Sequence, residues 1–377
     1  MKKIVALILT LCMLLSMTAC SGGNNTNNEP TVPPATEPPA TEPPATEPPV
    51  EVLEPSEGLE FTLEDDTHYV VSGIGTCTDT KIRIPDTYKG LPVTKVGGGA
   101  FCFNESLVSI VMGNNITSIG DNAFQDCVSL TSLTIPDGVI RIGVCAFGGC
   151  TSLTNITLPN SIISIGGDAF TGCVNLISVT IPNGVTLIDG GTFRSCESLT
   201  EVTIPNSVTR IDDSAFSDCA SLTSITLPDS VVSIGNYAFD NCTSLTDINI
   251  PDDVISIGDR AFRGCRSLTG ITVPDGVTSV GEFTFLDCSS LVVISLGNRL
   301  TSIGYGAFQG CKSLKSVVIP NSVRVIEGFA FWSCVNLTSV SYAGTTEQWE
   351  NVTLAEDWNS NIPAWEVICS NGRINIQ

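Results

Sequence analysis

A repeat of 23 residues constrains the fold of this chain more than any other feature of its sequence. A phenylalanine marks the repeat in eleven successive registers, without one insertion. These residues are Phe101, Phe124, Phe147, Phe170, Phe193, Phe216, Phe239, Phe262, Phe285, Phe308 and Phe331. Self-similarity at such a period is typical of a solenoid, in which every unit stacks on its neighbours.

One unit, SLTSITLPDSVVSIGNYAFDNC at residues 221–242, shows how a turn is built. Leu222, Ile225 and Leu227 have the spacing of inward positions on a short strand, and Pro228 ends that strand. Its buried apolar side chains contribute roughly 1.5–3 kcal/mol each, but ordering each backbone residue costs about 1–2 kcal/mol. A single unit is therefore unstable alone. The predicted fold is a β-rich leucine-rich-repeat solenoid of eleven 23-residue turns, with strands on one face, helical or irregular returns on the other, and a cap at each end.

The first 20 residues have the pattern of an export signal. Lys2 and Lys3 precede an apolar stretch of about a dozen residues, shorter than the roughly 20 that a membrane-spanning helix needs. The segment 17–20, MTAC, resembles the bacterial lipobox, which implies cleavage before Cys20 and a lipid on its sulfur. Such a lipid would anchor the chain to the membrane. The alternative is an ordinary signal peptide with an incidental cysteine.

Residues 21–57 are predicted to be a disordered tether. They contain three copies of ATEPP, and proline-rich segments of this kind favour an extended polyproline II conformation. The domain organisation that follows is a signal at 1–20, the tether at 21–57, an N-terminal cap at 58–96, the solenoid at 97–342 and a C-terminal cap at 343–377.

Ten of the 16 cysteines recur three residues after a repeat phenylalanine. They are Cys127, Cys150, Cys173, Cys196, Cys219, Cys242, Cys265, Cys288, Cys311 and Cys334. Stacked turns bring successive α-carbons within disulfide range, but parallel Cβ vectors disfavour bonding. We interpret these cysteines as buried thiols that act as small apolar side chains. Disulfides between turns and a metal ladder are the alternatives.

The pattern IGxxAFxxCxSLTxIxIPxxVT resembles the BspA-like leucine-rich repeats of bacterial surface proteins, over about residues 59–369. The flanks at FTLEDDTHYVVSG and YAGTTEQWENV resemble the caps of such arrays. The resemblance implies a surface protein that adheres to host or microbial surfaces by binding extracellular protein or glycan. It implies no catalytic motif.

Charge and composition exclude several classes of binding partner and active site. The formal net charge is −22, and removal of Lys2 and Lys3 makes it −24, since −22 − 2 = −24. Nucleic acid is then an unsuitable partner, because phosphate binding requires clustered Lys and Arg. His68 is the only histidine, so a histidine-dependent triad or a histidine-rich zinc site is not expected. We expect no cofactor, no metal and no enzymatic activity.

Two arrangements of carboxylates are the alternatives to that expectation. Asp189 and Asp212 occupy equivalent corners of adjacent turns, about 5 Å apart if the turns stack, which is the spacing of a retaining glycosidase pair. The simpler interpretation is that aspartate tolerates the left-handed backbone that glycine usually supplies there. A stack of calcium sites at the aspartates after the strand-ending prolines is disfavoured, because asparagine alternates with aspartate at that position.

The outward positions of the predicted strands carry mainly threonine and serine. Glu201, Asp247 and Asn249 interrupt this pattern near the middle of the array. We therefore predict that they bind a ligand on a concave solenoid face. The expected function is adhesion or ligand binding at the bacterial cell surface, with the membrane contacted only through the lipid. A glycan-active hydrolase and a structural envelope protein that self-associates are the alternatives.

Overall fold

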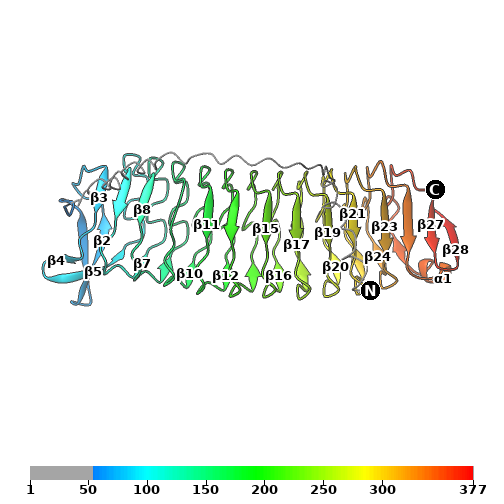
Figure 1. Ribbon diagram of the computed structural model, residues 1–377, viewed down its shortest axis with the longest axis horizontal. Coiled ribbons are helices and arrows are strands. Elements are labelled where there is room, and N and C mark those ends of the chain that lie inside the picture. The colour runs from blue at the N-terminus through cyan, green and yellow to red at the C-terminus, as the bar shows by residue number, and fades with distance from the viewer. Residues whose placement is uncertain (1–53, 377) are drawn as a thin grey trace, which may run out of the picture. The chain divides into compact units, whose positions relative to one another are not determined.

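The fold class predicted from the repeat is confirmed. The computed structural model describes residues 54–376, so the predicted signal, Cys20 and residues 21–53 of the predicted tether lie outside it. Within the described residues, successive turns stack along one axis, with the strands side by side (Figure 1).

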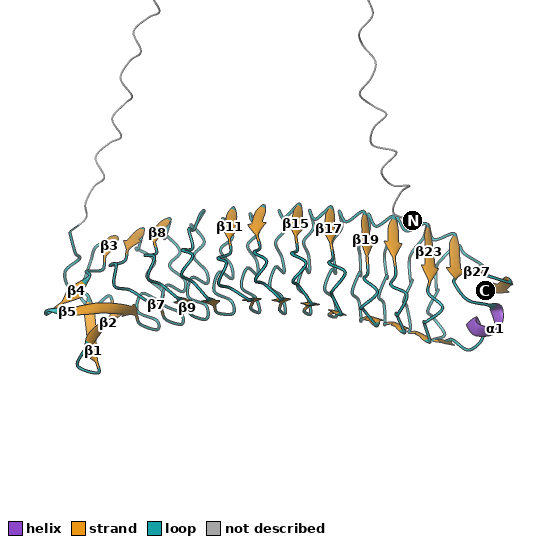
Figure 2. Ribbon diagram, turned by 60° about the horizontal axis from the view of Figure 1, so that its bottom comes forward, coloured by secondary structure: helices purple, strands orange, loops and turns teal. Residues whose placement is uncertain are grey.

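One side of the solenoid, here called the strand face, carries a strand from nearly every turn (Figure 2). Its strands are β3 (Lys81–Arg83), β6 (Ser109–Val111), β8 (Ser132–Thr134), β11 (Ser178–Thr180), β13 (Glu201–Thr203), β15 (Ser224–Thr226), β17 (Asp247–Asn249), β19 (Gly270–Thr272), β21 (Val293–Ser295), β23 (Ser316–Ile319), β25 (Ser339–Tyr342) and β27 (Glu366–Cys369). Between β8 and β11, an isolated parallel bridge from Asn155 to Ser178 takes the place of a strand. Strand pairs in the repeats are parallel and in register, so that Ile225 lies beside Ile248.

The second extended arm of each turn forms a row of two-residue strands along another side. They are β7 (Ser118–Ile119), β9 (Arg141–Ile142), β10 (Ser164–Ile165), β12 (Leu187–Ile188), β14 (Arg210–Ile211), β16 (Ser233–Ile234), β18 (Ser256–Ile257), β20 (Ser279–Val280), β22 (Ser302–Ile303), β24 (Val325–Ile326) and β26 (Thr353–Leu354). Hydrogen-bonded turns around the repeat phenylalanines close each unit, and we call this third side the return side. Its backbone N–H groups donate to the next turn, as from Phe124 to the carbonyl of Ala146 at 2.8 Å.

The array has about 13 turns of roughly 23 residues, two more than predicted. The difference arises at the C-terminal end. In a unit such as 221–242 the strand precedes the phenylalanine, so β3 shares a turn with Phe101 and β23 with Phe331. Beyond Phe331, β25 pairs with β23 and β27 pairs with β25, and no repeat phenylalanine follows either strand, so a count of phenylalanines omits these two turns.

The two ends of the described solenoid are closed differently. At the N-terminal end, β1 (Glu60–Glu64) and β2 (His68–Gly73) form an antiparallel pair, and β4 (Thr87–Tyr88) pairs with β5 (Leu91–Val96). At the other end lie α1 (Thr346–Trp349) and β28 (Gly372–Asn375). Trp349 and Trp358 are buried and cover the last apolar layer, whereas 57% of Trp365 is exposed.

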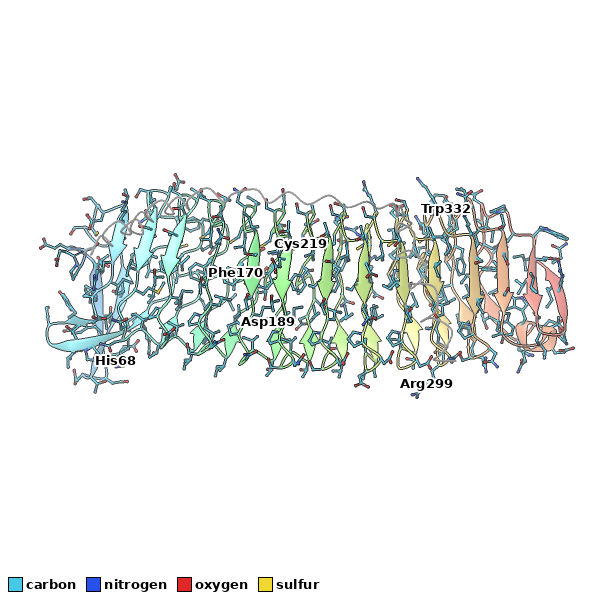
Figure 3. All side chains as sticks on the ribbon, in the orientation of Figure 1. His68, Phe170, Asp189, Cys219, Arg299 and Trp332 are labelled. Atoms are coloured by element: carbon cyan, nitrogen blue, oxygen red, sulfur yellow. The ribbon has the colours of Figure 1, made fainter. Side chains whose placement is uncertain are left out.

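The repeat phenylalanines form one continuous stack through the core. Neighbouring ring centroids lie 5.2–5.6 Å apart, and their planes differ by at most 14°. Each ring is buried, including Phe170 (Figure 3). Every ring therefore packs against the turn before it and the turn after it, which couples the stability of adjacent turns.

The ladder cysteines are buried free thiols in the described solenoid. Each sulfur also donates a hydrogen bond to the carbonyl of the phenylalanine 26 residues earlier, as from Cys219 to Phe193 at 3.2 Å. The same carbonyl accepts the backbone N–H of Cys196 within its own turn, at 3.2 Å. The interpretation as small apolar side chains was therefore incomplete, because the thiols also hydrogen-bond neighbouring turns. Burial raises the pKa of Cys127 and of Cys196 to about 12.

The glycine after the repeat isoleucine allows the backbones of adjacent turns to approach closely. A Cβ on Gly258 would lie 2.4 Å from the backbone nitrogen of Asn236 in the preceding turn. The left-handed residues of each turn lie elsewhere, two residues before and two after the phenylalanine, as at Asn122 and Asp126 with φ of 56°. Asp189 and Asp212 are not left-handed, so our explanation of their presence by backbone conformation was wrong.

Candidate binding site

Two strands of the strand face position the three predicted ligand-binding residues. Glu201 begins β13, while Asp247 begins and Asn249 ends β17, and all three are exposed. β15 lies between them, with Ser224 in register with Asp247. Two strand spacings separate Glu201 from Asp247, so their α-carbons lie about 10 Å apart.

The hydrogen-bonded ladder of the strand face is interrupted twice at this patch, once within it and once at its C-terminal edge. β11 pairs with β13, β15 with β17 and β19 with β21. Within residues 54–376, no strand pairing joins β13 to β15 or β17 to β19. Alternate junctions in the middle of the array therefore lack the ladder that holds the other strands together.

A shallow depression lies at each of these two interruptions. The first has a volume of about 410 Å³ and is lined by residues of β13 and β15, among them Glu201, Thr203 and Ser224. The second, of about 330 Å³, lies over β17, β19 and β21 and is lined by Asp247 and Asn249 among others. The structure thus places Glu201 in one depression and the other two predicted residues in the next.

The chemistry of these depressions suits binding of a polar partner. Carboxylates, an amide and hydroxyls surround floors made by strand residues such as Val202 and Ile248. Asn249 also lines a third depression of about 350 Å³, together with Asp229, Asp252 and Asp253. The local potential is therefore negative, which favours neutral or cationic groups over anionic ones.

The carboxylate pair considered for a hydrolase is held in other interactions. Asp212 forms an ion pair with Arg210, and its Oδ1 accepts a hydrogen bond from the backbone of Asp213 at 3.0 Å. Oδ1 of Asp189 accepts from the backbone of Gly190 at 2.8 Å. The Asp212 carboxylate also raises the pKa of the Arg210 guanidinium, through their hydrogen bond first. This arrangement neutralises one carboxylate and supplies no feature of a general acid.

His68 lies in the N-terminal cap, far from the predicted site along the array (Figure 3). Its Nε2 lies 3.3 Å from a carboxylate oxygen of Glu64, which also contacts Nζ of Lys95 at 2.5 Å. The hydrogen bond from Lys95 lowers the pKa of Glu64. His68 therefore belongs to a surface cluster of polar contacts with Glu64 and Lys95.

Sequence reasoning missed a set of residues on the return side. Tyr237, Arg260 and Phe283 occupy one register position in three consecutive turns, where the earlier turns carry smaller residues. The available signal was the departure from the repeat at this position.

Two general properties of the described solenoid bear on its chemistry. No helix among residues 54–376 is long and apolar enough to cross a membrane. Nor does that part of the chain place three or more His, Cys, Asp and Glu side chains where they could hold a metal ion.

Comparisons with known proteins agree with this architecture. The model of the BspA type leucine rich repeat region matches six copies, over residues 75–139, 117–246 and 232–357. A leucine rich cell surface protein from Faecalibacterium prausnitzii is 30% identical, with a TM-score of 0.56, and the match covers 81% of this chain and 98% of that one. A leucine-rich repeat protein from Bacteroides ovatus is 27% identical, with a TM-score of 0.56 and coverage of 83% and 99%. None of the curated proteins matches. Because the family model spans most of the sequence, the chain belongs to the BspA type leucine-rich-repeat family.

Proposed function

We propose that this protein is a bacterial cell-surface adhesin that binds extracellular protein or glycan on its strand face, around Glu201, Asp247 and Asn249. The observation that carries the proposal is the coincidence of two independent features. The residues that break the hydroxyl pattern of the sequence line depressions at the interruptions of the strand ladder. Because many functions share one repeat fold, a local irregularity on the regular scaffold is the feature that can carry a specific one.

The surface location rests on two further observations. The similar protein from Faecalibacterium prausnitzii is described as a cell surface protein. The sequence of this chain begins with a signal-like segment and the MTAC motif. We propose that a lipid on Cys20 holds the solenoid outside the cell and is its sole attachment to the membrane.

The partner follows from the charge of the molecule and the shape of the site. A formal charge of −22 repels nucleic acids and other polyanions. The depressions are open and lie in a row along the strand face, which suits an extended polar partner that contacts several turns. The depressions at the two interruptions each contain one carboxylate, Glu201 or Asp247, whereas a hydrolase needs both an acid and a base.

Replacing Cys20 tests the anchor. In a bacterial host that processes lipoproteins, the Cys20→Ser variant is expected to leave the detergent phase in detergent partitioning, because it lacks the thiol that carries the lipid. The wild-type protein is expected to stay in that phase. Equal partitioning of both proteins into the aqueous phase would remove the lipid from the proposal.

The combined variant Glu201→Ala, Asp247→Ala and Asn249→Ala tests the strand-face site. Binding of the full-length protein is measured against immobilised extracellular-matrix proteins and arrayed glycans. We expect at least a tenfold loss of affinity for the best ligand, because polar contacts that are well placed contribute about 0.5–1.5 kcal/mol each. The free energy of unfolding of this variant should change little, since all three side chains are exposed.

Thr134→Ala is the matched control, because Thr134 is exposed at an outward position of β8, on the same face. It is expected to bind like the wild type. If the triple variant keeps full affinity, the site lies elsewhere on the solenoid. If no ligand binds but the protein self-associates, the structural envelope role replaces adhesion.

A further inference from the structure

A stripe of aromatic and arginine side chains runs along the return side near the C-terminal end of the solenoid. We call it the aromatic stripe, and it consists of Tyr237, Arg260, Phe283, Tyr305, Phe329 and Trp332. The Arg260 guanidinium lies 5.4 Å from the ring centre of Tyr237 and 4.8 Å from that of Phe283. Ring centres then follow at 5.3 Å to Tyr305, 5.4 Å to Phe329 and 6.2 Å to Trp332. The stripe is thus continuous over five consecutive turns.

Four of these side chains depart from the repeat at a single register position, two residues before the repeat phenylalanine. In the earlier turns that position holds Gly99, Asn122, Cys145, Asp168, Gly191 and Ser214. In the later turns, Tyr237, Arg260, Phe283 and Phe329 occupy it with φ between 54° and 57°. Left-handed backbone is sterically unfavourable for bulky side chains, and outliers of this kind gather at functional sites. Four bulky side chains in one file, each only partly buried, favour a functional role for the stripe.

Glycines in the same part of the chain make room for the rings. A Cβ on Gly306 would lie 2.6 Å from the Phe283 ring, and one on Gly328 would lie 3.3 Å from the Tyr305 ring. The rings are therefore packed against backbone on one side. On the other side the stripe is open, with Tyr305 38% and Trp332 36% exposed. A rigid, half-exposed aromatic surface loses little side-chain entropy when it binds.

Carboxylates are fixed beside these rings. Oε2 of Glu327 accepts the backbone N–H of Tyr305 at 3.0 Å, and Oδ1 of Asp259 accepts that of Glu282 at 2.8 Å. The nearby cation Arg263 is occupied by Asp240, at 2.7 Å. Apart from Arg260, whose guanidinium lies over two rings of the stripe, these flanking groups are acidic or neutralised, which disfavours an anionic partner.

We propose that the aromatic stripe binds a neutral polysaccharide chain lengthwise along the solenoid. The C–H faces of sugar rings stack on aromatic rings, and sugar hydroxyls donate hydrogen bonds to flanking carboxylates. Five turns at the spacing of adjacent strands give a track on the order of 20 Å long, enough for several sugars of an extended chain. The site is separate from the strand face, so it stands or falls independently of the function proposed above.

The test is native electrophoresis of the full-length protein through gels that contain a soluble neutral polysaccharide, either a β-glucan, a xylan or a galactomannan. We expect at least one of them to retard the wild-type protein. The double variant Tyr305→Ala and Trp332→Ala should bind at least tenfold more weakly. Phe103→Ala is the matched control, because Phe103 is 69% exposed and left-handed but lies outside the stripe. It should be retarded like the wild type, as should the strand-face triple variant.

A second variant separates binding from folding. Tyr237→Asn introduces the residue that Asn122 supplies at the same position, so it should relieve backbone strain and keep or raise the melting temperature. Its retardation by the polysaccharide should nevertheless decrease. A purely structural stripe predicts the opposite, a lower melting temperature with unchanged retardation.

Three results would overturn the proposal. They are no retardation by any of the neutral polymers, equal retardation of the folded double variant, and stronger retardation by anionic polygalacturonate. Sedimentation supplies one more decisive result. If the wild type dimerises and the double variant does not, the stripe is an interface between copies of this chain.

Discussion

Raising the pH above 9 is expected to unfold the solenoid, because its buried thiols cannot ionise in place. Burial raises the pKa of nine ladder cysteines, from Cys127 to Cys311, above the ordinary value of 9.0. Between pH 9 and 12 the unfolded chain loses these protons and the native chain keeps them. The native state therefore binds more protons, and stability falls as the pH rises.

The size of this effect comes from the number of thiols. One thiol contributes about 1.4 kcal/mol for each pH unit in this window, so nine together lower the free energy of unfolding by on the order of 10 kcal/mol for each unit. That is comparable to the whole stability of a typical domain, about 5–15 kcal/mol. Circular dichroism should thus show a steep transition near about pH 10.

Urea unfolding at several pH values measures the slope directly. The variant Cys219→Ser, Cys242→Ser and Cys265→Ser replaces three of the nine thiols with hydroxyls, which do not ionise in this range. Its free energy of unfolding should fall with pH about one third less steeply than that of the wild type. An unchanged slope would assign the alkaline transition to other groups.

The Phe216→Ala substitution is expected to lower the free energy of unfolding by about 3–5 kcal/mol at pH 7. The Phe216 ring is fully buried, and its centre lies 5.5 Å from those of Phe193 and Phe239. The change leaves a cavity and breaks the stack in the middle of the array. Because each turn is stabilised only by its neighbours, the single unfolding transition should also broaden or split in two.

Denaturant unfolding followed by circular dichroism measures both consequences. Phe103→Ala is the control for loss of an aromatic ring, since 69% of Phe103 is exposed. It should change stability by less than about 0.5 kcal/mol. A loss below about 1 kcal/mol for Phe216→Ala would show that the stack contributes little beyond filling space.

Part of the candidate site could be predicted because it interrupts a pattern. Glu201, Asp247 and Asn249 stand out against a file of hydroxyls, and the alternation of strand side chains points them outward. The two depressions could not be predicted. They depend on whether neighbouring strands come close enough to hydrogen-bond, and nothing in the repeat distinguishes the junction of β13 and β15 from its neighbours.

The contacts within the aromatic stripe could not be predicted from the sequence either. The sequence contains Tyr237, Phe283 and Phe329 at one register position, but their ring contacts depend on side-chain directions that left-handed backbone sets. The reason for the glycine after the repeat isoleucine was likewise visible only in the structure. There the glycine is needed because backbones approach closely, and not because the conformation is left-handed.

By itself, the sequence determined the solenoid, its buried phenylalanine and cysteine files and the direction of each strand side chain. It could do so because a strict period makes every turn meet the same neighbours, and burial then follows from position alone. Only the tertiary structure decided the number of turns, the interruptions of the strand ladder and the contacts of the aromatic stripe. These depend on how closely neighbouring backbones stack and on caps that lack the repeat, which no periodic pattern encodes.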